Sequence, residues 1–590
     1  MRRFSTLILT ALSLTGCTAD GYRAEADRQV QAVIKERQEK TTGYTPEVEV
    51  EPTTQPIVPK KSYAKVPLTR QPDIGGTPIR RVTYTLPAEP LGPAIPDPSP
   101  LPDVEADIFA DAYRIQRSRL EYGPGLDEGS VAKLDLFAAI SYAVQNARTY
   151  RDQMESLYLS ALDVTLERHL FSPRPFVTTT ARYSGAQDSE VGSAYSVTQR
   201  VGVRQKLPYG GEIVATGLVT FVNALNDNIT DGESAELALR ATIPLWRGAG
   251  MVNLEPLIST ERELIYATRS FESYRRAFAV DVASRYFRTL IRYNALRNRF
   301  TNYRNLLDLV ERTEALFAAG RVTALEVQRA QQSLLSAEDA LNSAQFTLQS
   351  ELDDFKIFIG MPVNQGIELA FVDVQVAAID QAMGSPEELA LRYRLDLQTA
   401  RDRIDDAKRG ASNAVNQLGP SLDFTGGGAV GNGAGDPARR IDVESLQYDA
   451  GIVLDLPVDR LPERNAYRRA LIGLEQAKRR ATDLEENVIA DVRSAERTIR
   501  SAQYSLDIQR AGITLARERL DFANESLLLG RVTNSREVVE AQSSLLNAQD
   551  AFDRARADLQ IQMLQYLRDT GTLRVDPAAG ILGLAMTRDE

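Results

Sequence analysis

The sequence of 590 residues contains one cysteine, Cys17, and one histidine, His169. A single cysteine excludes an internal disulfide framework and a thiolate metal cluster, and a single histidine excludes a multi-histidine metal site. His169 lies in LERHLFSPRP, at the predicted end of a helix, where a histidine is expected to cap or pack. The sequence also shows no Gly-rich phosphate loop or nucleophile elbow. We therefore expect no enzyme activity, no resident metal and no cofactor.

The chain is acidic, with a formal net charge of -11. Nucleic acid and anionic lipid surfaces both require a basic patch, so neither is expected to be the main partner. The length exceeds what one hydrophobic core usually serves, which predicts two or more structural units.

The first residues, MRRFSTLILTALSLTGC, have the pattern of a secretory signal. A basic start precedes an apolar run that is too short to span a bilayer as a helix. The ending Leu14-Thr15-Gly16-Cys17 resembles the bacterial lipobox, which predicts a signal peptide over 1–16 and lipidation of Cys17. The alternative is an incidental cysteine in an ordinary signal peptide.

If Cys17 is lipidated, residues 17–125 are predicted to form a lipid-anchored, proline-rich extension. It begins with a possible polar helix, GYRAEADRQVQAVIKERQEK, and 14 of the 27 prolines then fall between Pro46 and Pro102. Such density disfavours helix and central strand, so the segment is either an extended tether or an ordered strap along the folded body.

Two similar rounds follow, over 126–370 and 371–575, before a C-terminal tail over 576–590. Each round runs from a helical stretch through alternating segments to a very long helical hairpin. In the first round SVTQRVGVRQKLP, EIVATGLVTFV and ELALRATIPLW alternate apolar and polar residues, and FVTTTARYSG is a weaker candidate strand. In the second round LGPSLDFTGGGAVG and SLQYDAGIVLDLP do the same. These segments are predicted strands with one apolar face.

The two hairpins share the phrase GRVT and the helix pattern after it. A seven-residue period of large residues with alanines between them predicts left-handed supercoiling and close helix packing. The first hairpin has Leu334, Leu341, Leu348 and Phe355 in this period, and the second has Leu545, Phe552, Leu559 and Tyr566. The chain is therefore predicted to be internally duplicated.

Apolar-faced strands in an exported chain suggest a membrane β-barrel, which must close so that every backbone group is paired. One copy offers too few strands for a conducting barrel, so several identical copies are expected to pool theirs. The long helices would then extend the same tube away from the membrane.

The sequence resembles the TolC-like outer-membrane factors, which are the exit channels of tripartite efflux pumps and type I secretion systems. The resemblance spans about Leu126 to Arg574 and rests on phrases that occur in the family's order. The repeat openings are LDLFAAISYAVQNARTYR and SPEELALRYRLDLQTA, the strand-to-helix entry is TIPLWRGAG, the end of the first repeat is FKIFIGMP, and the two turns are GRVT.

The resemblance implies a mainly α fold with a membrane β-barrel part, in which a trimeric barrel continues into a long α-helical coiled-coil periplasmic tunnel. It implies a homotrimer with four strands per copy, twelve in all. The first round departs from this pattern, because it offers three or four candidate strands where the family needs two. The surplus is expected to form either an extracellular hairpin or one bent long strand. It also implies a periplasmic adaptor, an inner-membrane transporter and outer-membrane lipid as partners. The expected location is the outer membrane of a Gram-negative-type cell, lipid-anchored and extending into the periplasm.

The GRVT turns resemble the family's periplasmic helix tips, which engage the adaptor. Each glycine is predicted to end a helix in the left-handed conformation, and each threonine to cap the next helix. The arginines are expected either to hold the closed tip or meet the adaptor, or to be ordinary exposed side chains. The residues concerned are Gly320, Arg321, Val322 and Thr323 in the first tip, and Gly530, Arg531, Val532 and Thr533 in the second.

After the second tip, Glu537 and Glu540 lie three residues apart, hence on one helical face. Their setting is similar to the family's acidic pattern at the tunnel entrance, and threefold symmetry would make each a ring of carboxylates that attracts cations or a blocking metal ion. The alternative is that both are solvated acids favoured by the helix dipole. The first hairpin has Glu326 and then Arg329 at the equivalent places.

The leading functional hypothesis is a passive conduit of a tripartite efflux or export system, with the exit duct of a type I secretion system as a variant. A different class of function is a lipid-anchored periplasmic coiled-coil scaffold without a pore. A wide tunnel selects little, so the inner-membrane partner is expected to choose the cargo. Trp246, the one tryptophan, is either an interfacial anchor or a packed core residue.

Overall fold

A computed structural model describes residues 19–42, 132–184, 194–224, 232–370, 385–432, 441–529, 535–576 and 581–584. The predicted lipidation site Cys17, the proline-rich segment and the second GRVT turn, Gly530 to Thr533, lie outside the described residues. The chain divides into two compact units, and each unit contains segments of both predicted repeats. The repeats of the sequence are therefore interleaved in space, and their boundaries stay a prediction.

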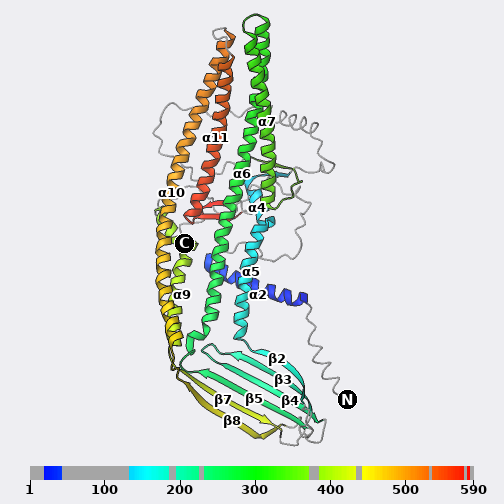
Figure 1. The fold of residues 1–590 in the computed structure, drawn as a ribbon, viewed down its shortest axis with the longest axis vertical. Coiled ribbons are helices and arrows are strands. Elements are labelled where there is room, and N and C mark those ends of the chain that lie inside the picture. Colours follow the sequence, from blue (N-terminus) through cyan, green and yellow to red (C-terminus); the bar gives the residue numbers. More distant parts are fainter. Residues whose placement is uncertain are drawn as a thin grey trace, which may run out of the picture. The chain divides into compact units, whose positions relative to one another are not determined.

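The predicted duplication appears in the element order of Figure 1. Helix α2 (Ala19–Thr42) precedes both rounds. The first round contains β1 (Ala132–Leu134), α4 (Leu136–Asn146), α5 (Arg148–Leu170), β2 (Arg174–Ser184), β3 (Ala194–Lys206), β4 (Glu212–Ala224), β5 (Gly232–Pro244), the short 3-10 helix η2 (Gly250–Leu254), α6 (Glu255–Ala318), α7 (Ala324–Ile359) and β6 (Ile367–Leu369). The second contains α8 (Pro386–Tyr393), α9 (Leu395–Gln417), β7 (Ser421–Gly431), β8 (Asp442–Asp455), α10 (Leu461–Leu528), α11 (Arg536–Asp569), β9 (Leu573–Asp576) and β10 (Ile581–Leu584).

Each round opens with two helices where the sequence pattern predicted one. The chain leaves the helical region at Ala147, with φ -67° and ψ 128°, and at the corresponding Arg394, with φ -68° and ψ 119°. Amphipathic periodicity does not show a one-residue break, because the apolar residues on either side keep nearly the same spacing. The break occurs at the same place in both rounds, which supports the duplication.

The sheet contains six antiparallel strands in the order β2-β3-β4-β5-β7-β8, drawn side by side in Figure 1. The strands are 11 to 14 residues long, which is enough to cross a bilayer when tilted. The first round supplies four of them, including the weak candidate FVTTTARYSG, which lies in β2. The family resemblance implied four barrel strands per copy, whereas the sequence of the first round offered three or four candidates where the family needs two. The structure forms strands from all four candidates, so the sheet of one copy has six strands. How many of them enter the barrel stays a prediction.

The first unit contains this sheet together with α2, most of α5, the start of α6, α9 and the start of α10. Its helices are joined by ion pairs. Glu261 of α6 accepts from Arg168 of α5 at 2.7 Å and from Arg37 of α2 at 2.9 Å. Asp402 of α9 accepts from Arg269 of α6 at 2.6 Å. These partly buried pairs fix which helix faces meet above the sheet.

The second unit contains the rest of the long helices and the short strands. Its core includes Tyr286 of α6, fully buried, whose hydroxyl donates to the Leu134 carbonyl at 3.1 Å and whose ring lies edge-on to Phe355 of α7 at 6.1 Å. The chain then turns at Gly360, with φ +78°, where an added Cβ would lie 2.2 Å from the Asn146 carbonyl oxygen. Both the dihedral angle and the close approach of α4 require glycine there.

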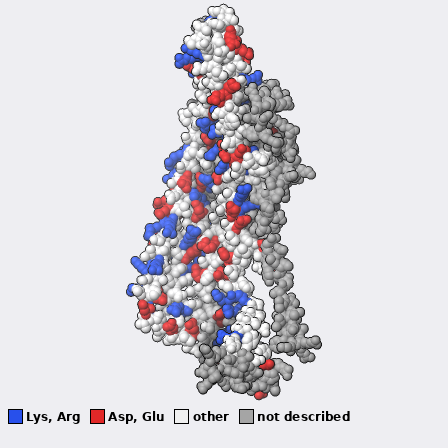
Figure 2. All heavy atoms as spheres, turned by 45° about the vertical axis from the view of Figure 1, so that its right-hand side comes forward, with Lys and Arg blue, Asp and Glu red and all other residues white. Residues whose placement is uncertain are grey.

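The chain's last described residues form a short hairpin, because β10 pairs antiparallel with β9. Part of the predicted C-terminal tail is therefore a strand. Among the described helices, none combines the length and the apolar character needed to cross a membrane. On the face shown in Figure 2, basic and acidic side chains alternate along the helices.

Candidate functional site

The first GRVT turn joins α6 to α7 by a glycine cap, as predicted. Gly320 has φ +72°, its N–H donates to the Phe317 carbonyl at 2.9 Å, and the Arg321 N–H donates to the Leu316 carbonyl at 2.9 Å. Nothing lies within 4 Å of a Cβ built on Gly320, so the requirement for glycine is conformational. The prediction of a left-handed C-terminal cap is confirmed at this tip.

The prediction for the cap of the next helix is only half right. Thr323 is the residue before α7 and has the extended conformation of an N-cap, but its side chain makes no capping hydrogen bond. Its backbone carbonyl instead accepts from the Glu326 N–H at 3.0 Å. Arg321 is exposed and Val322 half-buried, which leaves the arginine accessible to a partner.

The structure gives Glu326 a position that the sequence did not indicate. Its side chain is 6% exposed, and one carboxylate oxygen accepts from the Ser535 N–H at 2.9 Å and from the Ser535 hydroxyl at 2.7 Å. The other oxygen accepts from Arg329 at 2.7 Å. Since Ser535 precedes α11, the acid of the first hairpin caps a helix of the second hairpin, 209 residues further along.

Burial alone would raise the pKa of the Glu326 carboxyl, because it penalises the charged form. The hydrogen bonds from Ser535 and the guanidinium of Arg329 outweigh that effect and hold this pKa below its ordinary value. The carboxylate is therefore ionised at neutral pH and accepts charge-assisted hydrogen bonds. It joins the start of α7 to the start of α11 directly.

Below this contact, helices of both hairpins share one apolar cluster. The cluster includes alanines opposite leucines, which is the alternation of small and large residues that the sequence predicted. Ala337 belongs to it, and Leu334 and Leu545 of the predicted seven-residue period pack against it. Its buried members are Leu306 and Leu309 of α6, Ala337 of α7, Leu520, Ala523 and Leu527 of α10, and Val538 and Ala541 of α11.

Glu537 and Glu540 lie in the first turns of α11, and both are exposed. Glu540 accepts from Arg536 at 2.8 Å and lies 3.9 Å from a guanidinium nitrogen of Arg519 on α10. Among the described residues, two arginines therefore partly compensate the charge of Glu540, and no such pair is seen for Glu537. A ring formed by three copies of these side chains stays a prediction.

Further along α11, a second acidic group is partly buried against α6. Asn298 donates to Asp550 at 3.0 Å and to Asp553 at 3.2 Å, and Arg299 donates to Asp550 at 3.1 Å. Burial raises the pKa of Asp553, although the Asn298 amide and nearby Arg297 oppose the rise. No pattern in the sequence indicated this group, because its partners Asn298 and Asp550 are 252 residues apart.

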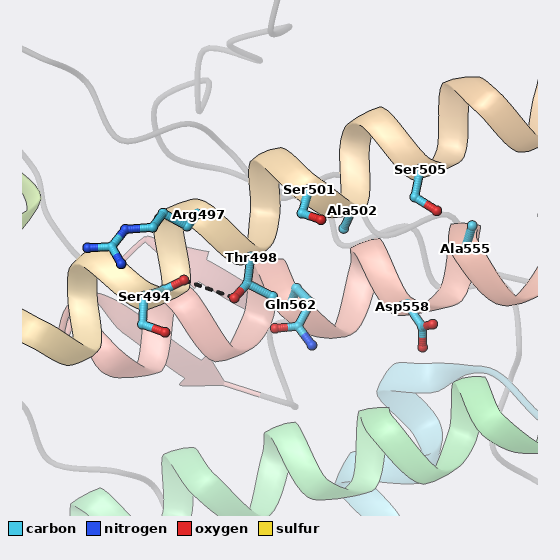
Figure 3. A pocket seen from close by; sticks show the side chains of 9 residues that line it. All are labelled: Ser494, Arg497, Thr498, Ser501, Ala502, Ser505, Ala555, Asp558 and Gln562. Carbon is cyan, nitrogen blue, oxygen red and sulfur yellow. Dashed lines mark hydrogen bonds between the residues drawn. The ribbon is translucent and has the colours of Figure 1, made fainter.

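Figure 3 shows a groove lined by residues of α10 and α11, among them the hydroxyl side chains of Ser494, Thr498, Ser501 and Ser505. The Thr498 hydroxyl donates to the Ser494 carbonyl of its own helix at 2.9 Å, so its donor is satisfied. Burial raises the pKa of Asp558, against the effect of Arg554 and Arg288. The remaining lining residues are Arg497, Ala502, Ala555 and Gln562.

Two other residues singled out in the sequence have plain roles in the chain. His169 lies in the last turn of α5, with its ring nitrogen 3.2 Å from the Ser172 hydroxyl, as expected of a capping residue. Trp246 follows β5 and is 55% exposed, so it is not packed into a core of this chain.

Comparisons with known proteins agree with this architecture. Residues 388–568 match the family model described as outer membrane efflux protein. The Nodulation protein T of Rhizobium leguminosarum bv. trifolii is 24% identical over 307 residues, and the match covers 50% of this chain and 63% of that protein. The matched region thus spans less than two thirds of that relative.

Solved outer-membrane proteins have the same fold. CusC superposes with a TM-score of 0.58 at 15% identity, covering 76% of this chain and 95% of CusC. The CmeC outer membrane channel of Campylobacter jejuni gives 0.56 at 14% identity, covering 74% and 85%. VceC of Vibrio cholerae gives 0.56 at 15% identity, covering 74% and 96%. The resemblance to TolC-like outer-membrane factors and the predicted fold class are confirmed.

Proposed function

Since residues 388–568 match the model of the outer membrane efflux proteins, we propose that this chain is the outer-membrane conduit of a tripartite efflux or export system. Three copies would form a β-barrel in the outer membrane that continues as an α-helical tunnel into the periplasm. The conduit carries out no chemistry, and the energy comes from an inner-membrane transporter reached through a periplasmic adaptor.

One observation carries this proposal, namely the sheet with one continuous apolar face. Such a face in water is a liability, whereas against lipid it is what a membrane barrel requires. A coiled-coil scaffold without a pore has no need of strands of 11 to 14 residues with an exposed apolar face. Single-channel recording in planar bilayers tests the proposal, because a conduit gives discrete current steps and a scaffold gives none.

The proposed lipid anchor has support from helix α2, which begins two residues after Cys17. In the first unit Val30 of α2 is fully buried, Asp27 accepts from the Tyr158 hydroxyl, and Arg37 pairs with Glu261 at 2.9 Å. The chain that follows the anchor is therefore held by the same unit as the sheet. Mass spectrometry of the mature N-terminus tests this: we expect diacylglycerol on Cys17, and an unmodified thiol would contradict it.

The adaptor is proposed to dock on the tips, where Arg321 is exposed. Site-specific photo-crosslinking from position 321 should capture the adaptor, and crosslinking from Tyr209, exposed beside the sheet, should not. The genes beside this one would identify the transporter class. A neighbouring gene for a proton-driven exporter would indicate an efflux pump, and one for an ATP-driven exporter would indicate a type I secretion system.

A further inference from the structure

Two of the six strands, β2 and β3, exceed the four that the family resemblance implied. They pair with each other from Arg174 opposite Arg204 to Ser184 opposite Ala194. β3 in turn pairs with β4 from Ala194 opposite Ala224 to Lys206 opposite Glu212. The added hairpin is therefore joined to the sheet along its whole length, as one continuous ladder.

The register aligns an apolar face across all six strands, although β4 is apolar on both faces. Val177 of β2 lies opposite Val201 of β3, which lies opposite Gly217 of β4, which lies opposite Leu237 of β5. Leu237 lies opposite Val430 of β7, and the alternation continues into β8. Large side chains on this apolar face that are exposed in the single chain are Val177, Tyr183, Tyr195, Val201, Val203, Leu237, Leu239, Phe424, Tyr448, Ile452 and Leu454.

The opposite face carries charged side chains on most of the strands, whereas on β4 it includes Val214, Leu218 and Val222. On β2 and β3 it includes Arg182, Arg200 and Arg204, and on β5 and β8 it includes Arg240 and Asp449. A hairpin that stood in water or folded into the lumen would need no apolar side. The pattern of β2 and β3, apolar on one face and polar on the other, is that of a barrel wall between lipid and water.

The sheet is open at β2 and β8, since no described strand pairs with the outer side of either. These edges are 11 and 14 residues long, and long unpaired edges bind other strands. Because the six strands alternate in direction, β8 of one copy and β2 of a rotated second copy run antiparallel. Each edge thus has the direction that pairing with the other requires, and β8 is long enough to cover the whole of β2.

We propose that all six strands form the barrel wall, so that β8 of each copy pairs with β2 of the next and three copies close an eighteen-stranded barrel. This inference rests on the proposed trimeric conduit and departs from the twelve strands implied by the family resemblance. With strands about 4.8 Å apart and tilted about 40°, the backbone radius is about 18 Å, against about 12 Å for twelve strands. Barrels of this strand number enclose an aqueous channel, here lined by the polar face.

Disulfide crosslinking in native membranes tests the inference, with Cys17 the one native cysteine. Thr179→Cys on β2 is combined in turn with Tyr448→Cys, Ala450→Cys, Ile452→Cys and Leu454→Cys on β8. All these positions lie on the apolar face. At least one pair should give covalent dimers and trimers on oxidation, because the four β8 positions sample the unknown register between copies.

The matched control uses Val219→Cys on β4 with the same four β8 variants. In an eighteen-stranded barrel β4 lies three strands from the neighbouring β8, roughly 14 Å away and beyond disulfide reach. In a twelve-stranded barrel β4 would be the edge that meets β8. Crosslinks from β4 without crosslinks from β2 would overturn the inference and leave the trimeric conduit standing.

Absence of crosslinks from both sets would contradict pairing between copies, and with it both the inference and the barrel. To separate this result from misfolding, single-channel currents of each variant are also recorded in planar bilayers under reducing conditions. A variant that still gives channels has folded and assembled. An electron cryo-microscopy map of the unmodified protein counts the strands of the barrel independently. Eighteen strands around the axis are expected, and twelve would refute the proposal.

Discussion

The Glu326 carboxylate accepts hydrogen bonds from both the backbone N–H and the hydroxyl of Ser535, at 2.9 and 2.7 Å. The contact joins the start of α7 in the first hairpin to the start of α11 in the second. A change at position 326 should therefore alter the second tip.

Replacing Glu326 by alanine should destabilise the start of α11 by about 1–3 kcal/mol, because the buried Ser535 N–H loses its acceptor. The Ser535 hydroxyl would keep only its longer contact, at 3.4 Å, with the backbone carbonyl of residue 326. Glu326→Gln should cost less, since its amide oxygen still accepts. Hydrogen exchange over residues 535–541 measures the effect. Glu338→Ala, at an exposed position of the same helix, is the control and should leave exchange unchanged. Equal exchange in Glu326→Ala and the unmodified protein would show that this contact does not hold the tip.

The same contact predicts a pH dependence. The folded-state pKa of Glu326 is held below its ordinary value of 4.5, so its stabilising contribution is present above that value and is lost as pH falls through the folded pKa. Exchange at the start of α11 should therefore accelerate on acidification only below pH 4.5, as the pH falls through the lowered pKa of Glu326. In Glu326→Gln this acceleration should be reduced. A pH profile that is the same in both proteins would assign the titration to another group.

Two glycines with similar dihedral angles should respond differently to alanine. Gly320→Ala places a Cβ in open space and should cost about 1 kcal/mol, the penalty of the left-handed conformation. Gly360→Ala adds a clash with the Asn146 carbonyl oxygen, 2.2 Å away, and should cost substantially more. The thermal dissociation midpoint of the assembled protein compares the two. Equal midpoints would mean that α4 moves to accommodate the methyl group.

The predicted carboxylate ring has its own test. The double variant Glu537→Gln and Glu540→Gln should lower the cation-to-anion permeability ratio and weaken block by divalent metal ions. Glu537→Gln alone should account for most of the change, because Glu540 is already paired with Arg536. Glu338→Gln serves as the charge-matched control. Unchanged selectivity and metal block in the double variant would leave these side chains as solvated acids.

The features that the sequence predicted are those with local or periodic signals. A turn residue predicted the glycine cap at Gly320. A period of two predicted the alternation in β3 to β5, and a period of seven predicted the packing of Ala337. The single-residue break at Ala147 escaped because it leaves the apolar spacing almost intact. Strand β2 was the weakest candidate because Thr178, Thr179 and Thr180 blur its alternation, and the pairing with β3 decided its place.

The main feature of the tip that the sequence did not indicate is the role of Glu326. Its partner Ser535 is 209 residues away, and a glutamate in the first turn of a helix ordinarily faces water. Only the packing of one hairpin against the other buries it. Contacts of this kind come from tertiary structure and have no signature in a single sequence.

The central claim is that this chain forms a conduit, and recording single-channel currents from the purified, unmodified protein in planar bilayers tests it most directly. The account predicts discrete current steps of uniform size from the trimeric fraction, which disappear when the same sample is heat-dissociated. A trimeric, folded preparation that inserts into the bilayer and passes no current would contradict the account.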